Sequence, residues 1–517
     1  VGNYFTDKAL PNVKTYFGKV EKGQPNVYDT PFAKGESTKD LLSSWNEVLV
    51  SIQDEWPSLY AFETDMATKV GPLSVQKPLK DRMNDIVDYY EGILLPSQPL
   101  SRSAILAVVK EWSPARGLWL RSVKRTWELM KKSTNSGSPY FTKRRNVYHN
   151  GGDLVIYSHG STTDGYENCA MLGWRGQEGG YSKTDVKQRV VWMFPFGINV
   201  AELQVYQPMI EAAQKFDLVP AWVSNEAVDK RITLLFDTKG KDDLIICTDF
   251  TKFDQHFGQH MQDAAKSIIA AIFNKSINEW LDHVFPIKYN IPMMFNYGEV
   301  ILGHHGMGSG SGGTNADETL AHRALQYEAA IKSGTRLNLN SMCLGDDGIL
   351  TYPGCTVKDV TDVYSTHGLE MNESKQYASV QDCVYLRRWH HRDYRVDGVC
   401  AGVYSTNRAL GRLRYLERYQ DPEYWGPKAV ALRQLSILEN VKYHPLRDQF
   451  AEFCMKRDKF RLGLDIPDFL DNLEAEVREV NDHMPDFLGY TKTLQSEGDP
   501  TYGINSWWIV KYLKSKR

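Results

Sequence analysis

Cysteine is scarce in this sequence and is never arranged in close pairs. The 517 residues include seven cysteines, an odd number, widely spaced and without a C-x-x-C motif. This argues against a disulfide framework or a cysteine zinc site, and it fits a reducing environment. Apolar runs are short as well, because none approaches the roughly 20 residues of a membrane-spanning helix. The first residues, VGNYFTDKALPNVKTYFGKV, contain no signal-peptide core, so neither a membrane segment nor a signal peptide is expected.

An excess of one charge sign is also missing, but the charges are segregated along the chain. The net charge is −3, which by itself predicts no anionic partner. Residues 102–145, however, hold eleven Lys or Arg against two Glu, interleaved with Trp112, Trp119 and Trp127. Such a mixture is typical of surfaces that follow a phosphate backbone and stack bases, although a solvated helix face over a buried aromatic stripe explains it equally well. Residues 465–487 are acidic and offset the basic block.

The length predicts two or three domains, or one large fold with subdomains. Periodicity predicts a mixture of helices and strands, an α/β protein, with four elements of interest. They are a buried strand over 242–250 that ends at Asp249, a helix over 259–276, a helix over 315–334 closed by Gly334, and a hairpin over 336–353. After about residue 405 the chain is mainly helical by the same criterion.

The tip of the predicted hairpin, CLGDDGIL (343–350), is acidic. Asp-Gly between apolar runs is a strong hairpin signal, with Gly348 expected to supply the positive φ of the turn. Taken alone, the turn is the favoured interpretation. A turn needs only one Asp-Gly, however, so the second acid calls for another explanation.

Pairing of the two strands would bring Asp249, Asp346 and Asp347 to one edge of a sheet. Three carboxylates without His or Cys suit a hard divalent ion, Mg²⁺ or Mn²⁺. Two such ions can activate a hydroxyl nucleophile and stabilise the leaving oxygen of a phosphoryl transfer. Asp254 lies beyond the strand end, where it could accept a hydrogen bond from a ribose hydroxyl.

The glycine-rich stretch GSGSGGTNADE (308–318) precedes the second predicted helix. Its glycines would let the backbone approach a ligand, while Ser309, Thr314 and Asn315 place small polar groups at the helix start. A helix N-cap preceded by a flexible loop is the simpler alternative.

Taken together, DFTKFD, SGSGGTN and LGDD resemble, in order and spacing, motifs A, B and C of viral RNA-dependent RNA polymerases. The residues of these motifs are most similar to those of the picobirnavirus polymerases, with the partitivirus enzymes as near relatives. The resemblance implies a right-hand fold of fingers, palm and thumb. It also implies an RNA-directed RNA polymerase that uses NTPs, template and product RNA and two Mg²⁺ ions, which Mn²⁺ can replace, and a double-stranded, segmented viral genome.

The resemblance assigns further residues on both sides of these motifs. SKTDVKQRVVWMFP (182–195) resembles motif F, whose cations hold the triphosphate. The motif F cations here are Lys183, Lys187 and Arg189. Lys375 matches the motif D lysine, which protonates the pyrophosphate leaving group as a general acid. Considered alone, the first segment is an amphipathic surface strand and the lysine is a solvated one.

Two more segments match motifs that contact RNA. STNSGSPY (133–140) resembles motif G, which lines the template path, and CVYLRRWHH (383–391) resembles motif E, which grips the 3′ end of the growing strand. The RNA-binding residues implied are Ser136, Gly137, Pro139, Arg387, Arg388 and Trp389. A strand that packs against the helical C-terminal part is also a plausible interpretation of the second segment, and the two interpretations are compatible.

One position departs from the family pattern. Many relatives carry the motif B Asn four residues after the Thr, where this chain has Glu318, and the chain has Asn315 instead. Positions 314 and 318 share a helix face, so Glu318 would point at the same site. We expect Asn315 with Asp254 to read the ribose 2′-hydroxyl, since a site built to bond that hydroxyl rejects the analogue without it.

The resemblance also implies a division of the chain. The expected parts are 1–70, an N-terminal bridge from fingers to thumb; 71–205, fingers; 206–258, palm; 259–300, fingers; 301–404, palm; and 405–517, thumb with a C-terminal tail. The tail, TYGINSWWIVKYLKSKR (501–517), is aromatic and basic. It would form either a plug for primer-independent initiation, with Tyr502, Trp507 and Trp508 as stacking surfaces, or an aromatic anchor on the thumb.

Two rival functions are compatible with parts of the sequence. A reverse transcriptase shares the metal-binding palm but usually has an aromatic residue at the acidic tip. A non-catalytic RNA-binding or capsid-associated protein would keep the basic block without the three acids. On the polymerase reading, we expect a monomer in the virion interior or host cytoplasm, with the viral capsid protein as a further partner.

Overall fold

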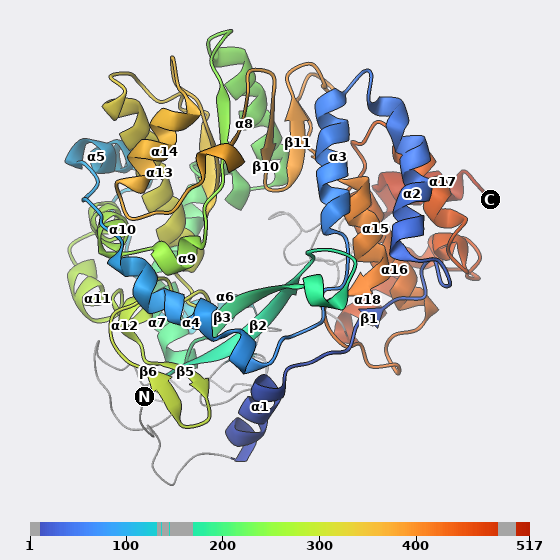
Figure 1. Cartoon of the computed structure of the whole chain (residues 1–517), viewed down its shortest axis with the longest axis horizontal. Helices are drawn as coiled ribbons and strands as arrows, with labels where there is room; N and C mark the ends of the chain where they lie inside the picture. The colour runs from blue at the N-terminus through green and yellow to red at the C-terminus, as the bar shows by residue number, and fades with distance from the viewer. Residues whose placement is uncertain (1–10, 132–135, 137–143, 145–168, 484–502) are drawn as a thin grey trace.

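The protein is described from a computed structural model that covers residues 11–131, 136, 144, 169–483 and 503–517. These residues form both helices and strands, which confirms the expected mixed α/β class. In Figure 1, α13 and α14 lie on one side of the molecule, and α2, α3 and α15 lie on the other.

The central sheet has the strand order β7-β8-β4-β9, with antiparallel neighbours. Its strands are β4 (Ile245–Thr248), β7 (Met342–Leu344), β8 (Asp347–Leu350) and β9 (Tyr377–Ser379). Thr248 stands opposite Gly348, so Asp249, the first residue after β4, lies beside the turn between β7 and β8. The strand that was predicted to end at Asp249 and the acidic hairpin are thereby confirmed.

Helices that pack on one another and on this sheet form the largest core. They include α5 (Arg102–Glu111), α9 (Phe253–His256), α10 (Gln259–Ile272), α11 (Ile277–His283), α13 (Thr314–Lys332) and α14 (Val357–Ser365). Met261, Ile268 and Ile272 of α10 are fully buried, as the periodicity predicted. Each such side chain contributes about 1.5–3 kcal/mol through burial. Gly334, with φ +70°, ends α13 as expected.

A second sheet has the order β3-β2-β5-β6. Its strands are β2 (Ala170–Gln177), β3 (Lys187–Met193), β5 (Met293–Asn296) and β6 (Glu299–Ile301). Side chains of α1 and α4 share its core. The helices around it are α1 (Pro11–Lys22), α4 (Met83–Glu91), α6 (Val123–Leu129), α7 (Phe196–Lys215) and α12 (Ile287–Asn290). This sheet lies below the central one in Figure 1.

A third, small sheet carries a strained turn. It is formed by β10 (Asp382–Tyr385), β11 (Arg388–His391) and β12 (Val403–Tyr404), next to α8 (Asn225–Thr238). Tyr385 pairs with Arg388, so Leu386 and Arg387 alone make the turn, with φ of 53° and 59°. Gly and Asn are the residues that usually fill such positions, because a larger side chain there costs about 1–2 kcal/mol.

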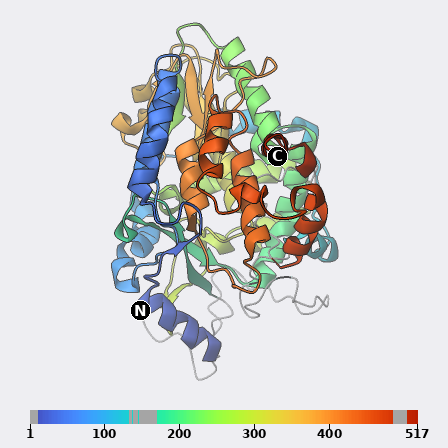
Figure 2. The ribbon, with the colours of Figure 1, turned by 90° about the vertical axis from the view of Figure 1, so that its right-hand side faces the viewer.

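Helices from the two ends of the chain share one core. They are α2 (Thr38–Leu49) and α3 (Pro57–Lys69) from the N-terminal part, and α15 (Thr406–Arg414), α16 (Pro427–Glu439) and α17 (Arg447–Met455) from the C-terminal part. The strands β1 (Tyr28–Asp29) and β13 (Tyr415–Leu416) pair across the same junction. Buried Glu63 also accepts hydrogen bonds from the amide and hydroxyl of Thr406. Figures 1 and 2 show α2 and α3 beside the C-terminal helices.

The end of the chain is anchored on these helices. After α18 (Leu473–His483), α19 (Trp508–Lys514) packs on α16 and buries Ile509. The amides of Trp508 and Ile509 donate to the carboxylate of Glu439 at 3.1 and 3.2 Å. Residues 503–517 thus form the aromatic anchor rather than the plug, while Tyr502 lies outside the described residues.

The turn of the acidic hairpin differs from the expectation in one residue. Gly345, with φ +58°, supplies the left-handed conformation of the acidic turn, so the assignment of that role to Gly348 is wrong. The reason is the register, since Leu344 pairs with Asp347 and leaves Gly345 and Asp346 as the turn.

No helix among the described residues combines the length and apolarity that crossing a membrane requires.

Candidate active site

Three carboxylates meet at one edge of the central sheet. Asp249 leaves the end of β4, Asp346 occupies the second position of the β7–β8 turn, and Asp347 begins β8. Since β4 and β8 are neighbouring antiparallel strands, the end of one strand lies beside the start of the other. The spacing in the sequence predicted this convergence.

The field around Asp346 is strongly negative. Its side chain reaches solvent, yet desolvation by the surrounding protein raises its pKa above the ordinary value, and the carboxylates of Asp254 and Asp249 raise it further. Arg189 acts in the opposite direction. Negative charge is therefore concentrated at the turn, and Arg189 offsets it only in part.

Three lysines from distant parts of the chain face Asp249. Desolvation raises the pKa of Asp249, while Lys375, Lys69 and Lys187 each lower it. Lys375 and Lys187 are the motif D and motif F lysines singled out in the sequence. Lys69 ends α3 and was not expected at this site, because no motif contains it.

Asp347 is held by the neighbouring strained turn. Its Oδ2 accepts a hydrogen bond of 2.8 Å from the amide of Leu386. Burial raises the pKa of Asp347 to about 7, although this hydrogen bond and nearby Arg387 lower it. The second acid of the tip is thus tied into the protein more firmly than Asp346.

The donor atoms at this edge fit a hard divalent ion. Among the described residues, no three His, Cys, Asp or Glu side chains converge as a ready-made metal site. The acids Asp249 and Asp346 nevertheless offer only oxygen donors, and repulsion from the carboxylate of Asp249 contributes to the raised pKa of Asp346. A divalent cation between them relieves that repulsion, and oxygen donors are what Mg²⁺ prefers.

Asp254 and Glu318 form a second acidic pair beside the first. Glu318 is 5% exposed and lies on α13 one turn after Thr314. Burial raises its pKa well above the ordinary value, and a hydrogen bond to the carboxyl of Asp254 raises it further. Glu318 therefore shares the site that Asp254 faces, as the helix geometry predicted.

Asn315 has a protein partner of its own. Its Oδ1 accepts a hydrogen bond of 2.8 Å from the indole nitrogen of Trp222. Its amide nitrogen approaches Gly345, since a Cβ on Gly345 would lie 3.6 Å from it. Asn315 is thus near the acidic turn, with its orientation set by Trp222.

The glycines of the 308–318 loop serve packing. A Cβ at Gly308, Gly310 or Gly313 would collide with Phe194, with the backbone of Trp192 or with the ring of Tyr206. The expectation that these glycines also let the backbone approach a ligand stays a prediction. They let the loop lie directly against β3 and α7.

The two hydroxyls expected at the nucleotide also bond within the protein. Ser309 donates to the carbonyl of Val190 at 3.2 Å, which ties the loop to β3. Thr314 donates to the carbonyl of Gly308 at 3.0 Å and closes the loop at the start of α13. Both side chains are partly exposed, so each keeps a face toward solvent.

The motif F cations stand on and before β3. Lys187 and Arg189 are two residues apart, so they lie on the same face of the strand, and both are exposed. Lys187 lowers the pKa of Asp249, and Arg189 lowers the pKa of Asp346. Lys183 is exposed in the short turn Lys183–Asp185 that precedes the strand. Lys375 is likewise exposed, in the turn Glu373–Lys375.

Two of the three motif E residues are structural. Arg388 is 8% exposed and forms a bidentate ion pair with Asp229 at 2.9 and 3.0 Å. Trp389 is fully buried and donates to Ser58 at 3.0 Å. Their predicted contact with RNA is therefore wrong, and the alternative of a packed strand holds. Arg387 alone is partly exposed, at the turn.

Of the motif G residues, only Ser136 is described, and it is fully buried. Gly137 and Pro139 lie outside the described residues.

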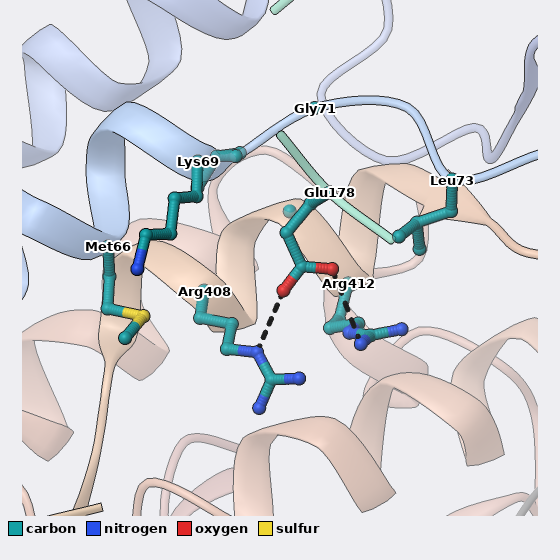
Figure 3. A pocket seen from close by; sticks show the side chains of 9 residues that line it. Met66, Lys69, Gly71, Leu73, Glu178, Arg408 and Arg412 are labelled. Atoms are coloured by element: carbon teal, nitrogen blue, oxygen red, sulfur yellow. Dashed lines mark hydrogen bonds and ion pairs between the residues drawn. The ribbon is translucent and has the colours of Figure 1, made fainter. Parts of the chain in front are cut away.

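A cluster of cations around Glu178 lies next to this edge, and no motif predicted it. Glu178 accepts from Arg408 at 3.0 Å and pairs with Arg412 at 3.4 Å and with Arg387 at 3.7 Å. Burial would raise the pKa of Glu178, but Arg412 and Arg408 lower it to about 2. Figure 3 shows Glu178 between Arg408 and Arg412, in a cavity that Lys69 also lines. The spacing of Arg408 and Arg412, one turn apart on α15, was the available signal.

The chain resembles known proteins over its whole length. It matches the family described as viral RNA-dependent RNA polymerase over residues 121–401. It is 57% identical over 521 residues to a potential RNA-dependent RNA polymerase of human picobirnavirus (strain Human/Thailand/Hy005102), covering 98% of this chain and 97% of the relative.

Two crystal structures share its fold. One is the RNA-dependent RNA polymerase of a human picobirnavirus, with a TM-score of 0.92, 56% identity, and coverage of 100% of this chain and 98% of that one. The other is an insertion loop deletion mutant of such a polymerase, with a TM-score of 0.90, 54% identity and the same coverage. This likeness confirms the expected right-hand architecture.

Proposed function

The chain belongs to the viral RNA-dependent RNA polymerases, and among them to the picobirnavirus polymerases, and we propose that it copies a double-stranded, segmented RNA genome by two-metal nucleotidyl transfer. As an RNA-directed RNA polymerase it uses NTPs and template RNA. The observation that carries the proposed mechanism is the meeting of Asp249 and Asp346 at one sheet edge, faced by Lys375, Lys187 and Arg189.

Asp249 and Asp346 are the proposed ligands of two Mg²⁺ ions, for which Mn²⁺ can substitute. When bound, such ions lower the pKa of the attacking 3′-hydroxyl and offset charge on the α-phosphate. Asp347 assists from the start of β8. Because its Oδ2 is bonded to Leu386, we assign it mainly to fixing the turn and to adding negative charge.

The cations around the acids bind the triphosphate in this proposal. Lys187 and Arg189 neutralise its oxygens, and Arg189 offers a planar fork of donors that matches phosphate geometry. Lys183 extends the same positive surface toward solvent. Lys375, which faces Asp249, donates a proton to the departing pyrophosphate.

The second acidic pair reads the sugar. Asp254 accepts a hydrogen bond from the ribose 2′-hydroxyl, and Asn315, oriented by Trp222, contributes from the start of α13. Ser309 and Thr314 line the same loop. A deoxynucleotide leaves these groups without a partner, and an unpaired buried polar group costs about 1–3 kcal/mol.

RNA contacts are proposed for Arg387 at the strained turn and for Gly137 and Pro139 of motif G, while Ser136 is buried and does not offer one. The proposed subdomains keep the expected boundaries. The shared core of α2 and α3 with α15–α17 supports an N-terminal bridge to a thumb after residue 405. A monomeric state, a capsid protein partner, and work in the virion interior or host cytoplasm stay predictions.

Comparison of NTP and dNTP incorporation on an RNA template tests this function. We expect RNA-templated incorporation of NTPs, strong discrimination against dNTPs, and dependence on Mg²⁺ or Mn²⁺. Preferential use of dNTPs would indicate a reverse transcriptase. RNA binding without any incorporation would indicate the non-catalytic alternative.

A further inference from the structure

One face of α13 is bonded along the whole acidic hairpin. Each of Thr319, His322, Arg323 and Gln326 is three or four residues from two of the others, so their side chains lie on one side of the helix. All four bond to backbone groups of the β7–β8 hairpin. The helix therefore contacts this hairpin through polar side chains as well as through packing.

The first two of these residues bond to a single hairpin residue, Gly345. Its amide donates to the hydroxyl of Thr319 at 2.9 Å. Its carbonyl oxygen lies 2.8 Å from Nδ1 of His322. A carbonyl only accepts, so Nδ1 carries the hydrogen and donates. Both backbone groups of the residue directly before Asp346 are thus held by α13.

This clamp lies in a dry and closely packed place. Thr319 and Gly345 are buried, and His322 is fully buried. The ring of His322 meets Phe250 edge-on, at a centroid distance of 5.3 Å. A Cβ at Gly348 would lie 2.6 Å from the same ring. Gly348 is therefore required so that His322 can reach the turn, which gives this glycine a role other than turn geometry.

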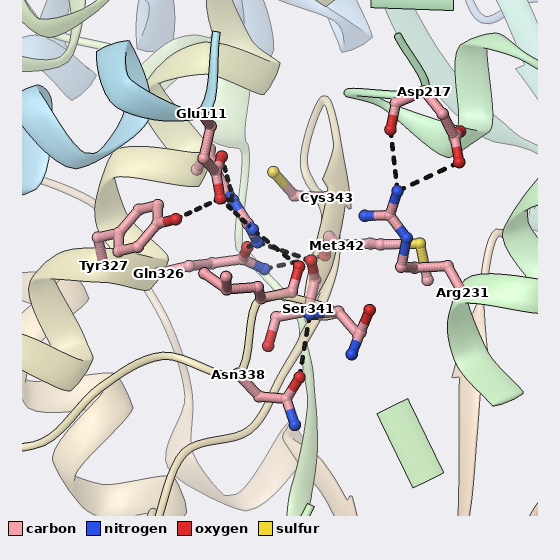
Figure 4. A network of polar contacts seen from close by, with 12 residues as sticks. Glu111, Asp217, Arg231, Gln326, Tyr327, Asn338, Ser341, Met342 and Cys343 are labelled. Carbon is pink, nitrogen blue, oxygen red and sulfur yellow. Dashed lines mark hydrogen bonds and ion pairs between the residues drawn. The ribbon is translucent and has the colours of Figure 1, made fainter. Parts of the chain in front are cut away.

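The other two residues of the face hold the stem of the hairpin. Arg323 donates to the carbonyl of Ser341 at 2.6 Å. Gln326 donates to the carbonyl of Met342 at 2.9 Å and to that of Ile349 at 3.2 Å. Figure 4 shows Gln326 beside Ser341 and Met342 in this network. These bonds stabilise the strands but do not touch the residue before Asp346.

We propose that Thr319 and His322 are positioning residues for the polymerase reaction: by clamping both backbone groups of Gly345 they hold the carboxylate of Asp346 at the metal-binding edge. This inference rests on the proposed function, in which Asp346 binds a divalent ion. The same helix begins at Thr314 and Asn315. About 7.5 Å of helix, five residues at 1.5 Å each, thus separates the nucleotide-reading end from the clamp.

Loss of the clamp should loosen the metal site before it unfolds the protein. Thr319→Val keeps the shape of the side chain and removes the acceptor, while Thr319→Ser keeps the acceptor. His322→Leu removes the donor from the other side. Supporting groups of this kind typically change metal affinity about 10–100-fold when they are removed.

Mn²⁺ binding to the full-length protein without nucleotide or RNA, followed by electron paramagnetic resonance of the free ion, provides a readout independent of turnover. We expect Thr319→Val and His322→Leu to weaken Mn²⁺ binding about tenfold, and Thr319→Ser to restore it. Gln326→Leu is the matched control on the same helix face. It should lower the melting temperature while leaving Mn²⁺ affinity unchanged.

Hydrogen exchange on the wild-type protein tests the clamp without any substitution. The amide of Gly345 should exchange slowly, and rapid exchange would overturn the proposal. The proposal would also be overturned if Thr319→Val and His322→Leu bound Mn²⁺ like the wild type. If Asp346→Asn failed to bind Mn²⁺ in the same experiment, the proposed function would still stand. If Asp346→Asn itself binds Mn²⁺ and polymerises normally, the proposed function fails.

Discussion

The amide of Leu386 donates a hydrogen bond of 2.8 Å to Oδ2 of Asp347, so the strained turn of one hairpin holds the acidic tip of another. Leu386 and Arg387 both have positive φ. Local strain at such a point persists only where the surrounding structure enforces it. Here the turn places one backbone donor on the acidic tip and one arginine in the Glu178 cluster.

The substitution Arg387→Asn tests two properties of this turn separately, its backbone strain and its positive charge. Asn tolerates positive φ better than Arg, so the free energy of unfolding should rise by about 0.5–1 kcal/mol. Loss of the cation should weaken binding of duplex RNA and reduce its log–log salt dependence by about one. Denaturant titration and RNA binding at several salt concentrations measure the two effects.

Arg392→Asn is the matched control, because Arg392 lies just beyond β11 and pairs with exposed Asp393. It should change neither quantity. Unchanged RNA affinity and salt dependence in Arg387→Asn would remove Arg387 from the RNA-binding surface.

Asp346→Ala should abolish RNA-templated incorporation and leave folding intact. The side chain of Asp346 is exposed and carries an unfavourable field from Asp254 and Asp249. Its removal should therefore change the free energy of unfolding by no more than about 0.5 kcal/mol. Incorporation by the purified variant, checked alongside its circular dichroism, decides the matter, and retained nucleotidyl transfer would refute the catalytic assignment.

Asp254→Ala should reduce the preference for NTPs over dNTPs. Removal of one hydrogen bond to a charged group is worth about 1.5–3 kcal/mol, which corresponds to about 10–100-fold in the ratio of kcat/KM values. Asn315→Ala should have a smaller effect, because its Oδ1 is already bonded to Trp222. Equal or larger loss of discrimination in Asn315→Ala would reverse the order of these two roles.

Glu202 makes stability depend on pH. This fully buried residue of α7 accepts from the hydroxyl of Ser311, and burial raises its pKa to about 7 although Lys288 lowers it. Lys288 forms its ion pair with Asp317, at 3.0 Å. A pKa raised on folding stabilises the protein at low pH, and that stabilisation is lost as pH rises through about 7.

Between pH 5.5 and 8.5, the wild type should therefore lose about 2 kcal/mol of unfolding free energy relative to Glu202→Gln, by linkage to this one proton. Glu211→Gln is the control on the same helix, since Glu211 is exposed and pairs with Arg121. Denaturant titrations at both pH values measure the difference. A difference between wild type and Glu202→Gln that does not vary with pH would show that Glu202 does not titrate in this range.

The secondary structure around the acids could be predicted because local patterns determine it. The apolar run before Asp249, the helical face of α10 and the glycine that ends α13 each depend on neighbours within a few residues. The turn glycine was misassigned for a related reason: Gly345 and Gly348 both flank the acids, and only the pairing of Leu344 with Asp347 decides between them.

The remaining errors and omissions come from contacts between distant segments. Arg388 resembles an RNA-binding arginine in the sequence, but its partner Asp229 lies 159 residues away. Glu178 and Arg408 are 230 residues apart and meet only when the end of β2 packs against α15. The same applies to His322, whose partner Gly345 lies 23 residues further on, in the β7–β8 turn. No local pattern contains this information.

The position of bound Mn²⁺ tests the central claim most directly. A crystal of the protein soaked in Mn²⁺ and measured for anomalous scattering would locate the ion without reference to activity. The account predicts a peak with carboxylate oxygens of both Asp249 and Asp346 at about 2.0–2.2 Å, as expected for small hard cations. A peak bound elsewhere, with neither acid as a ligand, would contradict it.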